Sequence, residues 1–115
     1  MFDFQKLEVY KKAKLFHLTC KDVILTRPLD QYVKDQLGRA SFSVPLNIAE
    51  GSGRNSKREF IHFLSISLGS LTELETQFVI SAELEYLNDF IEIKTLIKRI
   101  RIMTSSLIHK LSELT

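Results

Sequence analysis

The sequence predicts an all-α fold: one antiparallel, up-down-up-down four-helix bundle over residues 1–115. Apolar side chains return every three or four positions along four successive segments, which is the spacing of amphipathic helices. Short connections separate these segments, as in a bundle of antiparallel neighbours. No segment has the alternating pattern of a strand bounded by hairpin turns.

Composition narrows the class of protein. The chain has 115 residues, of which 44% are hydrophobic and 26% charged, values typical of one folded soluble domain. Its 16 basic and 14 acidic side chains give a charge of only +2, so a nucleic-acid interpretation depends on where the charges lie. No apolar run has the length of a membrane span, and the lone Cys20 cannot form an internal disulfide. We therefore expect a cytoplasmic protein with no membrane contact.

The first helix is predicted from Lys6 to Thr26. It ends at Arg27-Pro28, because the residue before a proline is steered away from helical angles. Its apolar surface is wide and consists of two adjoining stripes: Leu7, Tyr10, Ala13, His17, Cys20 and Ile24 form the first, and Val9, Phe16 and Val23 the second.

The second helix is predicted to begin after Asp30, a plausible N-cap. Its apolar stripe comprises Val33, Leu37, Ala40, Val44 and Ile48. Pro45 lies inside this stripe, where a proline costs roughly 3 kcal/mol in a regular helix. Either the helix breaks before Pro45 or one kinked helix continues to Glu50. We favour the kinked helix, because the apolar spacing is kept across the proline.

The third helix is predicted from Lys57 to Leu87, with Ser56 and Glu59 at capping-box spacing. One stripe comprises Phe60, Phe63, Ser67, Ser70, Leu74 and Phe78, and a neighbouring one Ile61, Leu64 and Leu68. Small residues from Ser65 to Ser70 favour close approach of a partner helix, so we assign Gly69 to packing.

The fourth helix is predicted to follow Asn88-Asp89, which can stop one helix and cap the next. Its stripe has coiled-coil-like spacing and comprises Phe90, Ile93, Ile97, Ile100, Thr104, Leu107, Leu111 and Leu114.

The candidate binding residues are two basic groups. Arg39, Arg54, Lys57 and Arg58 are predicted around the second connection, and Lys98, Arg99 and Arg101, with Lys94, near the start of the last helix. A solvated helix face explains each group alone. If both groups face the same way, or repeat around a ring of subunits, they form a surface for nucleic-acid phosphates. No aromatic side chains are interleaved with these charges, which argues against reading of bases.

The corner between the second and third helices would shape this surface. Gly51 is predicted to close the second helix in the left-handed conformation. Free amides at the start of the third helix would add to the positive charge beside Arg54. For Glu50 we favour a structural ion pair or a role as a cap partner over catalysis. Asn47 lies just off the apolar stripe and needs hydrogen-bond partners, such as Gln36 of a neighbouring helix or subunit.

The sequence predicts no catalytic, metal or cofactor site. The three histidines are scattered, and none lies near a cysteine or an acidic pair at metal-ligand spacing. The Gly51-Ser52-Gly53 segment lacks the remaining residues of a P-loop. We therefore expect a non-enzymatic protein.

Three motifs resemble one family. They read Gln36-Leu37-x-Arg39-Ala40-x-x-Ser43-Val44-Pro45-x-Asn47-Ile48-Ala49-Glu50-Gly51, Glu59-Phe60-x-x-Phe63-Leu64 and Gly69-Ser70-Leu71-x-Glu73-Leu74-Glu75. Together with Leu7-x-Val9-Tyr10 and Pro28, they resemble the four-helix-bundle proteins encoded in intervening sequences of bacterial 23S rRNA genes. The same family includes the accessory variability determinant of diversity-generating retroelements. The resemblance covers almost the whole chain.

This resemblance implies a homopentamer around a central channel, and in the retroelement branch it implies RNA binding and a reverse-transcriptase partner. Gly38 and Leu68 stand where the family often has basic residues. The leading hypothesis is an oligomer that binds RNA or DNA phosphates through its basic groups. The rival is a structural or protein-interaction oligomer, an accessory subunit without nucleic-acid binding.

Overall fold

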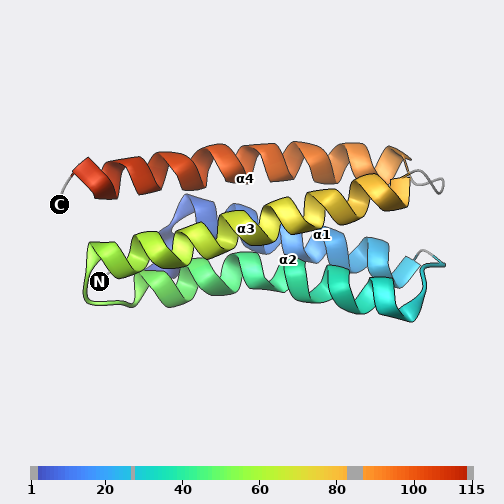
Figure 1. Ribbon diagram of the computed structural model, residues 1–115, viewed down its shortest axis with the longest axis horizontal. Coiled ribbons are helices and arrows are strands. Elements are labelled where there is room, and N and C mark those ends of the chain that lie inside the picture. Colours follow the sequence, from blue (N-terminus) through green and yellow to red (C-terminus); the bar gives the residue numbers. More distant parts are fainter. Residues whose placement is uncertain (1–2, 27, 83–86, 114–115) are drawn as a thin grey trace.

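The computed structural model describes residues 3–26, 28–82 and 87–113 and consists of four long helices (Figure 1). A 3-10 turn at Phe4–Lys6 precedes α1 (Glu8–Thr26), and α2 (Gln31–Ser52), α3 (Lys57–Ala82) and α4 (Leu87–Glu113) follow. These described residues contain no strand, so the all-α class is confirmed. Within the same ranges, no helix is both long and apolar enough to cross a lipid bilayer.

The four helices pack around one core, each between two neighbours. α1 contacts α2 and α4, and α3 contacts the same two helices. In the part of the chain that the structure describes, α1 and α3 are diagonal to each other and do not pack together, and neither do α2 and α4. The bundle measures 46 by 20 by 20 Å. The α2–α3 connection lies at the same end as the C-terminus of α4 (Figure 1). The antiparallel order stays a prediction.

The predicted apolar stripes form most of the core. On α2, the buried apolar side chains are Leu37, Ala40, Val44 and Ile48. On α1 they come from both predicted stripes, because this helix packs on α2 and α4 at once: Val9, Ala13, Phe16, Cys20 and Val23. On α4 they are Ile93, Ile97, Ile100 and Leu111. Full burial of one such Leu, Ile or Phe stabilises the fold by about 1.5–3 kcal/mol.

The buried face of α3 lies between its two predicted stripes. It comprises Phe60, Leu64, Ser67, Ser70, Leu71 and Leu74. The small residues do allow close packing on α2, since Ser67 Oγ donates to the carbonyl of Val44 at 3.0 Å. Gly69 takes no part in this packing within the subunit, so its assignment to the packing of a partner helix stays a prediction. Gly69 is exposed, and a Cβ built on it would meet nothing within 4 Å, because this position faces away from α2 and α4.

The proline in α2 does not interrupt the helix. α2 is continuous from Gln31 to Ser52 with Pro45 buried inside it, so the choice of one continuous helix over a break is confirmed. The kink stays a prediction. Asp30 occupies the N-cap position with extended backbone angles (φ −60°, ψ 146°), but its side chain makes no capping hydrogen bond.

The boundary between α3 and α4 differs from the prediction. α4 begins at Leu87, so Asn88-Asp89 lies within its first turn and does not separate the two helices. An acidic residue is favoured in a first turn by the helix dipole, so this pair suits either position. Leu114 lies outside the described residues, and so do the side chains of Phe78 and Phe90, so their predicted contacts stay predictions.

Candidate nucleic-acid interface

A tight corner joins α2 to α3 at one end of the bundle. The C-cap of α2 is Gly53, whose amide donates to the carbonyl of Glu50 at 3.3 Å. Ser56 caps α3, because its Oγ accepts a hydrogen bond from the amide of Glu59 at 3.1 Å. This half of the predicted capping box is confirmed. The corner holds Arg54 and the first turn of α3 in fixed positions.

Gly51 has a different role from the one predicted. It lies within α2 and does not close it in the left-handed conformation. A Cβ at this position would lie 2.7 Å from Phe63 Cβ and 2.9 Å from Phe60 Cδ1, far inside van der Waals contact. The prediction was wrong because a glycine near a helix end can indicate either a cap or a close approach. Here it allows the end of α2 to touch the start of α3.

Arg54 is held by two neighbours. Its guanidinium lies 3.7 Å from the carboxylate of Glu50 and 4.8 Å from the centre of the Phe63 ring. The Arg54 and Glu50 side chains are about half exposed, at 46% and 54%, so their ion pair contributes little energy. The cation–π contact adds to the fixing of the guanidinium over the corner. The ion pair favoured for Glu50 is therefore present.

A surface hollow at the corner is lined by two arginines and a histidine. Arg54, Arg58 and His62 line it together with Ser56, Glu59 and Phe63. Lys57 is half-buried at the first position of α3. His62 was not among the predicted site residues. The signal that could have found it is its spacing, since His62 follows Arg58 by four positions and so lies on the same face of α3.

Asn47 takes part in a polar layer between α2 and α3. Its Nδ2 donates to the Ser43 carbonyl at 2.8 Å and contacts Ser43 Oγ at 2.9 Å, and Ser43 Oγ is 2.8 Å from Ser70 Oγ. Both partners of Asn47 belong to Ser43 in its own helix, and Ser43 in turn reaches Ser70 of α3. Within the subunit the Asn47 amide thus finds its partners one turn away and not at Gln36, and a contact with Gln36 of another subunit stays a prediction. Asn47 is half-buried and lies one turn before Gly51 in α2.

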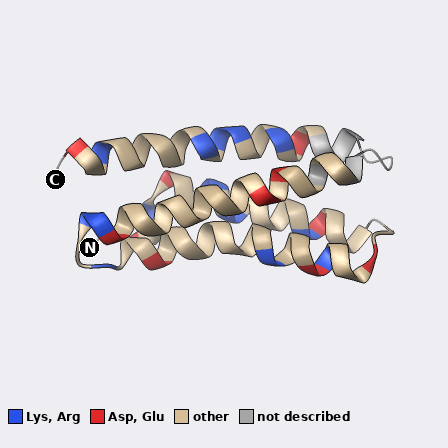
Figure 2. Ribbon diagram, viewed as in Figure 1, with Lys and Arg blue, Asp and Glu red and all other residues tan. Residues whose placement is uncertain are grey.

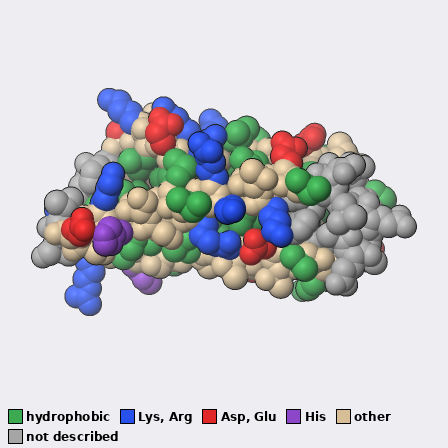
Figure 3. Space-filling model, turned by 90° about the horizontal axis from the view of Figure 1, so that it is seen from above, with side chains coloured by type: hydrophobic (Ala, Val, Ile, Leu, Met, Phe, Trp, Pro, Cys, Tyr) green, Lys and Arg blue, Asp and Glu red, His purple; other side chains and the backbone are tan. Residues whose placement is uncertain are grey.

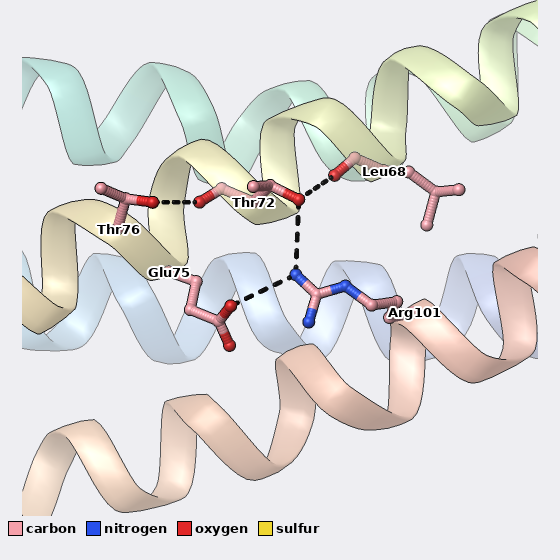
Figure 4. Close-up of polar contacts among 5 residues, drawn as sticks. All are labelled: Leu68, Thr72, Glu75, Thr76 and Arg101. Carbon is pink, nitrogen blue, oxygen red and sulfur yellow. Dashed lines mark hydrogen bonds and ion pairs between the residues drawn. The ribbon is translucent and has the colours of Figure 1, made fainter.

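The second basic group lies in the middle of α4 and not near its start. Lys98 and Arg99 are exposed, and in the described part of the chain neither forms an ion pair. Arg101 points instead toward α3, where Nη2 lies 3.5 Å from Glu75 Oε1 and 3.5 Å from Thr72 Oγ1 (Figure 4). Arg101 therefore ties α4 to α3, and Lys98 and Arg99 provide the charge that faces solvent.

The predicted residues fall into separate places. Arg39 lies 15 positions before Arg54 in the sequence and is exposed on α2, roughly 20 Å away along the helix. Its assignment to the cluster at the corner is therefore wrong, because α2 runs uninterrupted between the two. Figure 2 shows the corner group at the start of α3 and the other group midway along α4. From above, Lys and Arg side chains gather over the middle of the face that carries α4 (Figure 3).

Other reactive side chains do not form a site. The described residues contain no group of three or more His, Cys, Asp or Glu that could hold a metal ion. Cys20 is buried in the core, and this burial raises the pKa of its thiol to about 12. Burial and the nearby Lys21 lower the pKa of His17, whose Nδ1 lies 2.8 Å from Ser41 Oγ.

Comparison with known proteins supports the resemblance seen in the motifs. Residues 5–106 match the family model described as 23S rRNA-intervening sequence protein. This chain belongs to that family. The 23S rRNA-intervening sequence match spans all four helices and includes both basic groups.

A solved structure shares the fold of this 23S rRNA-intervening sequence protein. It is the crystal structure of a protein of unknown function from the S23 ribosomal protein family of Bacteroides thetaiotaomicron VPI-5482. The two chains are 21% identical and superpose with a TM-score of 0.80, over 87% of this chain and 97% of the other. None of the curated proteins matches. The link to the retroelement accessory protein stays a prediction.

Proposed function

We propose that this protein is a non-enzymatic, oligomeric member of its family that binds RNA or DNA through backbone phosphates. The observation that carries the proposal is the pair of exposed cations, Lys98 and Arg99, in the middle of α4. Over its whole length α4 has five basic residues and three acidic ones, whereas the sequence from Glu59 to Ala82 in α3 has no Lys or Arg. α4 is therefore a basic helix, whereas α3 has no basic side chain of Lys or Arg after Arg58.

The two basic groups suit an extended polyanion. The end of α4 lies beside the α2–α3 corner, so Arg99 is roughly 20 Å from the corner group along the bundle axis. One strand of a DNA duplex has about six phosphates over that length, at about 3.4 Å each. Arg58 at the corner and Lys98 with Arg99 on α4 would be the main contacts. Arg54 and Arg101 contribute less, because each already has a carboxylate neighbour.

The binding is testable by titrating a fluorescent 20-nucleotide RNA, single-stranded and duplex, over a series of salt concentrations. We expect binding at low salt that weakens as salt rises, because bound counterions are released. Reversing Lys98→Glu and Arg99→Glu together should flatten the slope of log K against log salt by about 1.4 for a single strand, at about 0.7 per phosphate contact. Affinity that does not depend on salt, or no binding at low salt, would refute the proposal.

A matched control separates the α4 surface from net charge. The double reversal Lys34→Glu with Arg39→Glu changes the net charge equally, but on α2, which is diagonal to α4. We expect this variant to keep most of the wild-type affinity. An equal loss in both double variants would show that net charge alone governs binding, and would overturn the assignment to α4.

The rival function is a structural or protein-interaction oligomer without nucleic-acid binding. Large exposed apolar side chains favour it, among them Leu25 at 71%, Tyr32 at 73% and Ile80 at 61% exposure. Such surfaces commonly mark contacts between proteins. Reversing the charges of Arg54, Lys57 and Arg58 discriminates the two functions. Lost RNA binding with intact assembly supports phosphate binding, whereas lost assembly supports the rival.

We also propose that the protein assembles as a homo-oligomer in the cytoplasm, with the pentamer implied by the family resemblance as the expected state. The up-down-up-down order belongs to this proposal. It is supported by the short connections between α1 and α2 and between α2 and α3, which favour antiparallel neighbours. Sedimentation equilibrium measures the subunit number directly, and a monomer at all concentrations would contradict the assembly.

A further inference from the structure

Two diagonal helices carry outer faces of opposite character. In the described residues α1 and α3 do not pack on each other, so their outer faces point in different directions from the bundle. In Figure 1, α3 lies in front and α1 lies behind. Each of these faces has exposed apolar side chains that the subunit's own core does not use.

The outer face of α1 alternates lysine and leucine. Lys14, Leu18, Lys21 and Leu25 follow one another at steps of four, three and four positions, so they form one stripe along the helix. Leu18 is 51% exposed and Leu25 71%. Asp22 is the single acidic residue between Val9 and Thr26, against four lysines in the same range.

The outer face of α3 is apolar and acidic, with small residues between. Ile66, Gly69, Glu73, Thr76 and Ile80 form one stripe, at steps of three, four, three and four positions. Ile66 is 39% exposed and Ile80 61%. The absence of Lys and Arg between Glu59 and Ala82 leaves this face without a cation of its own. It therefore complements a lysine-bearing surface in charge.

We propose that the α1 stripe of one subunit packs against the α3 stripe of a second copy of this chain. Charge complementarity favours a second copy as the occupant, because the Lys14 and Lys21 side chains would meet a face whose exposed charge is Glu73. The contact also explains why position 69 is a glycine, since a residue without a side chain leaves room for a neighbouring helix. This inference rests on the oligomer in the proposed function and names the surfaces that form it.

The contact is head-to-tail, because it joins two different faces of the same chain. Repetition of such a contact gives a closed ring or an open chain, and never a symmetric pair alone. α2 and α4 take no part in it. The Lys98 and Arg99 side chains of every subunit therefore stay exposed, and they repeat around the assembly.

The test uses two variants that each damage one face. Leu18→Asp places a charge in the α1 stripe, and Ile66→Asp places one in the α3 stripe. Both native side chains are exposed, so we expect each variant to fold. Circular dichroism checks the folding. In sedimentation velocity we expect an oligomer for the wild type and a monomer for each variant. An equimolar mixture of the two should form one-to-one dimers, because one intact α1 stripe meets one intact α3 stripe and the damaged faces stop growth. Ile102→Asp on α4 is the matched control and should assemble like the wild type.

Several outcomes would overturn the inference. The first is a monomeric wild type. The second is an equimolar mixture of the two Asp variants that stays monomeric, as each variant does alone. The third is a loss of assembly in Ile102→Asp equal to that in the other variants. If either Asp variant unfolds, Lys21→Glu, Glu73→Lys and their combination replace the pair. Each single reversal should then weaken assembly and the double reversal should restore it. A monomer that binds RNA refutes this contact alone, and an oligomer that does not bind RNA refutes only the phosphate proposal.

Discussion

Replacing Gly51 with alanine is the sharpest test of how α2 and α3 meet. The added methyl carbon would lie 2.7 Å from Phe63 Cβ and 2.9 Å from Phe60 Cδ1. Carbon atoms prefer separations of about 3.5–4.0 Å, so the helices must move apart by roughly 1 Å at this point. Phe63 Cβ is attached directly to the backbone and cannot rotate away. The strain therefore falls on the helix packing.

The expected loss of stability follows from two opposing effects. Overpacking of a well-packed contact costs about 1–3 kcal/mol. Exchange of a helical glycine for alanine returns about 1 kcal/mol through better helix propensity. We expect Gly51→Ala to lower the free energy of unfolding by up to about 2 kcal/mol. In a chain of this size each kcal/mol corresponds to about 4 °C in Tm.

The matched control is Gly38→Ala on the same helix. A Cβ at Gly38 would meet nothing within 4 Å, so only the propensity gain applies. Urea unfolding followed by circular dichroism should therefore show opposite signs for the two variants, with Gly38→Ala more stable than the wild type. If Gly51→Ala proves as stable as Gly38→Ala, the close approach at this corner is wrong.

Three further predictions concern buried groups. Thr104→Val should raise the free energy of unfolding by about 1 kcal/mol, because Thr104 Oγ1 is buried in the subunit without a hydrogen-bond partner, and an unchanged or lower value would indicate a partner. The Cys20 thiol, with its pKa raised to about 12 by burial, should resist thiol reagents at pH 8 in the native protein and react fully in denaturant; rapid native labelling would contradict its burial. The lowered pKa of His17 means that the unfolded chain takes up its proton first as pH falls. Stability should therefore decrease as pH drops below about 6.5 toward the folded pKa, and His17→Gln should reduce this dependence in urea titrations at several pH values.

The spacing of apolar residues and the residues typical of helix ends predicted most of the fold. The α2 stripe from Leu37 to Ile48 is buried as expected, because apolar spacing of three and four positions directly indicates the face toward the core. Boundaries were less certain. Asn88-Asp89 suits either a cap or a first turn, so its residue types alone could not place the start of α4.

The candidate site was harder to predict, because it depends on contacts between helices. Arg101 belongs to a basic run in the sequence, yet its guanidinium lies beside Glu75 of α3, and no local pattern indicates that partner. Gly51 and Gly69 show the same limit. Both are helical glycines, but one touches two phenylalanines and the other faces open space. Only the rotation of each helix about its axis decides between these roles.

The hydroxyl layer between α2 and α3 has a consequence for how firmly the two helices are aligned. Two apolar helix faces can shift along each other at little cost in energy, because each turn presents similar aliphatic side chains. A slip of one turn, about 5.4 Å, would remove Ser67 from the Val44 carbonyl and Ser43 from Ser70, leaving hydroxyls against hydrocarbon. The hydrogen bonds of these serines therefore fix the position of α2 along α3. They also fix the point at which Gly51 contacts Phe63.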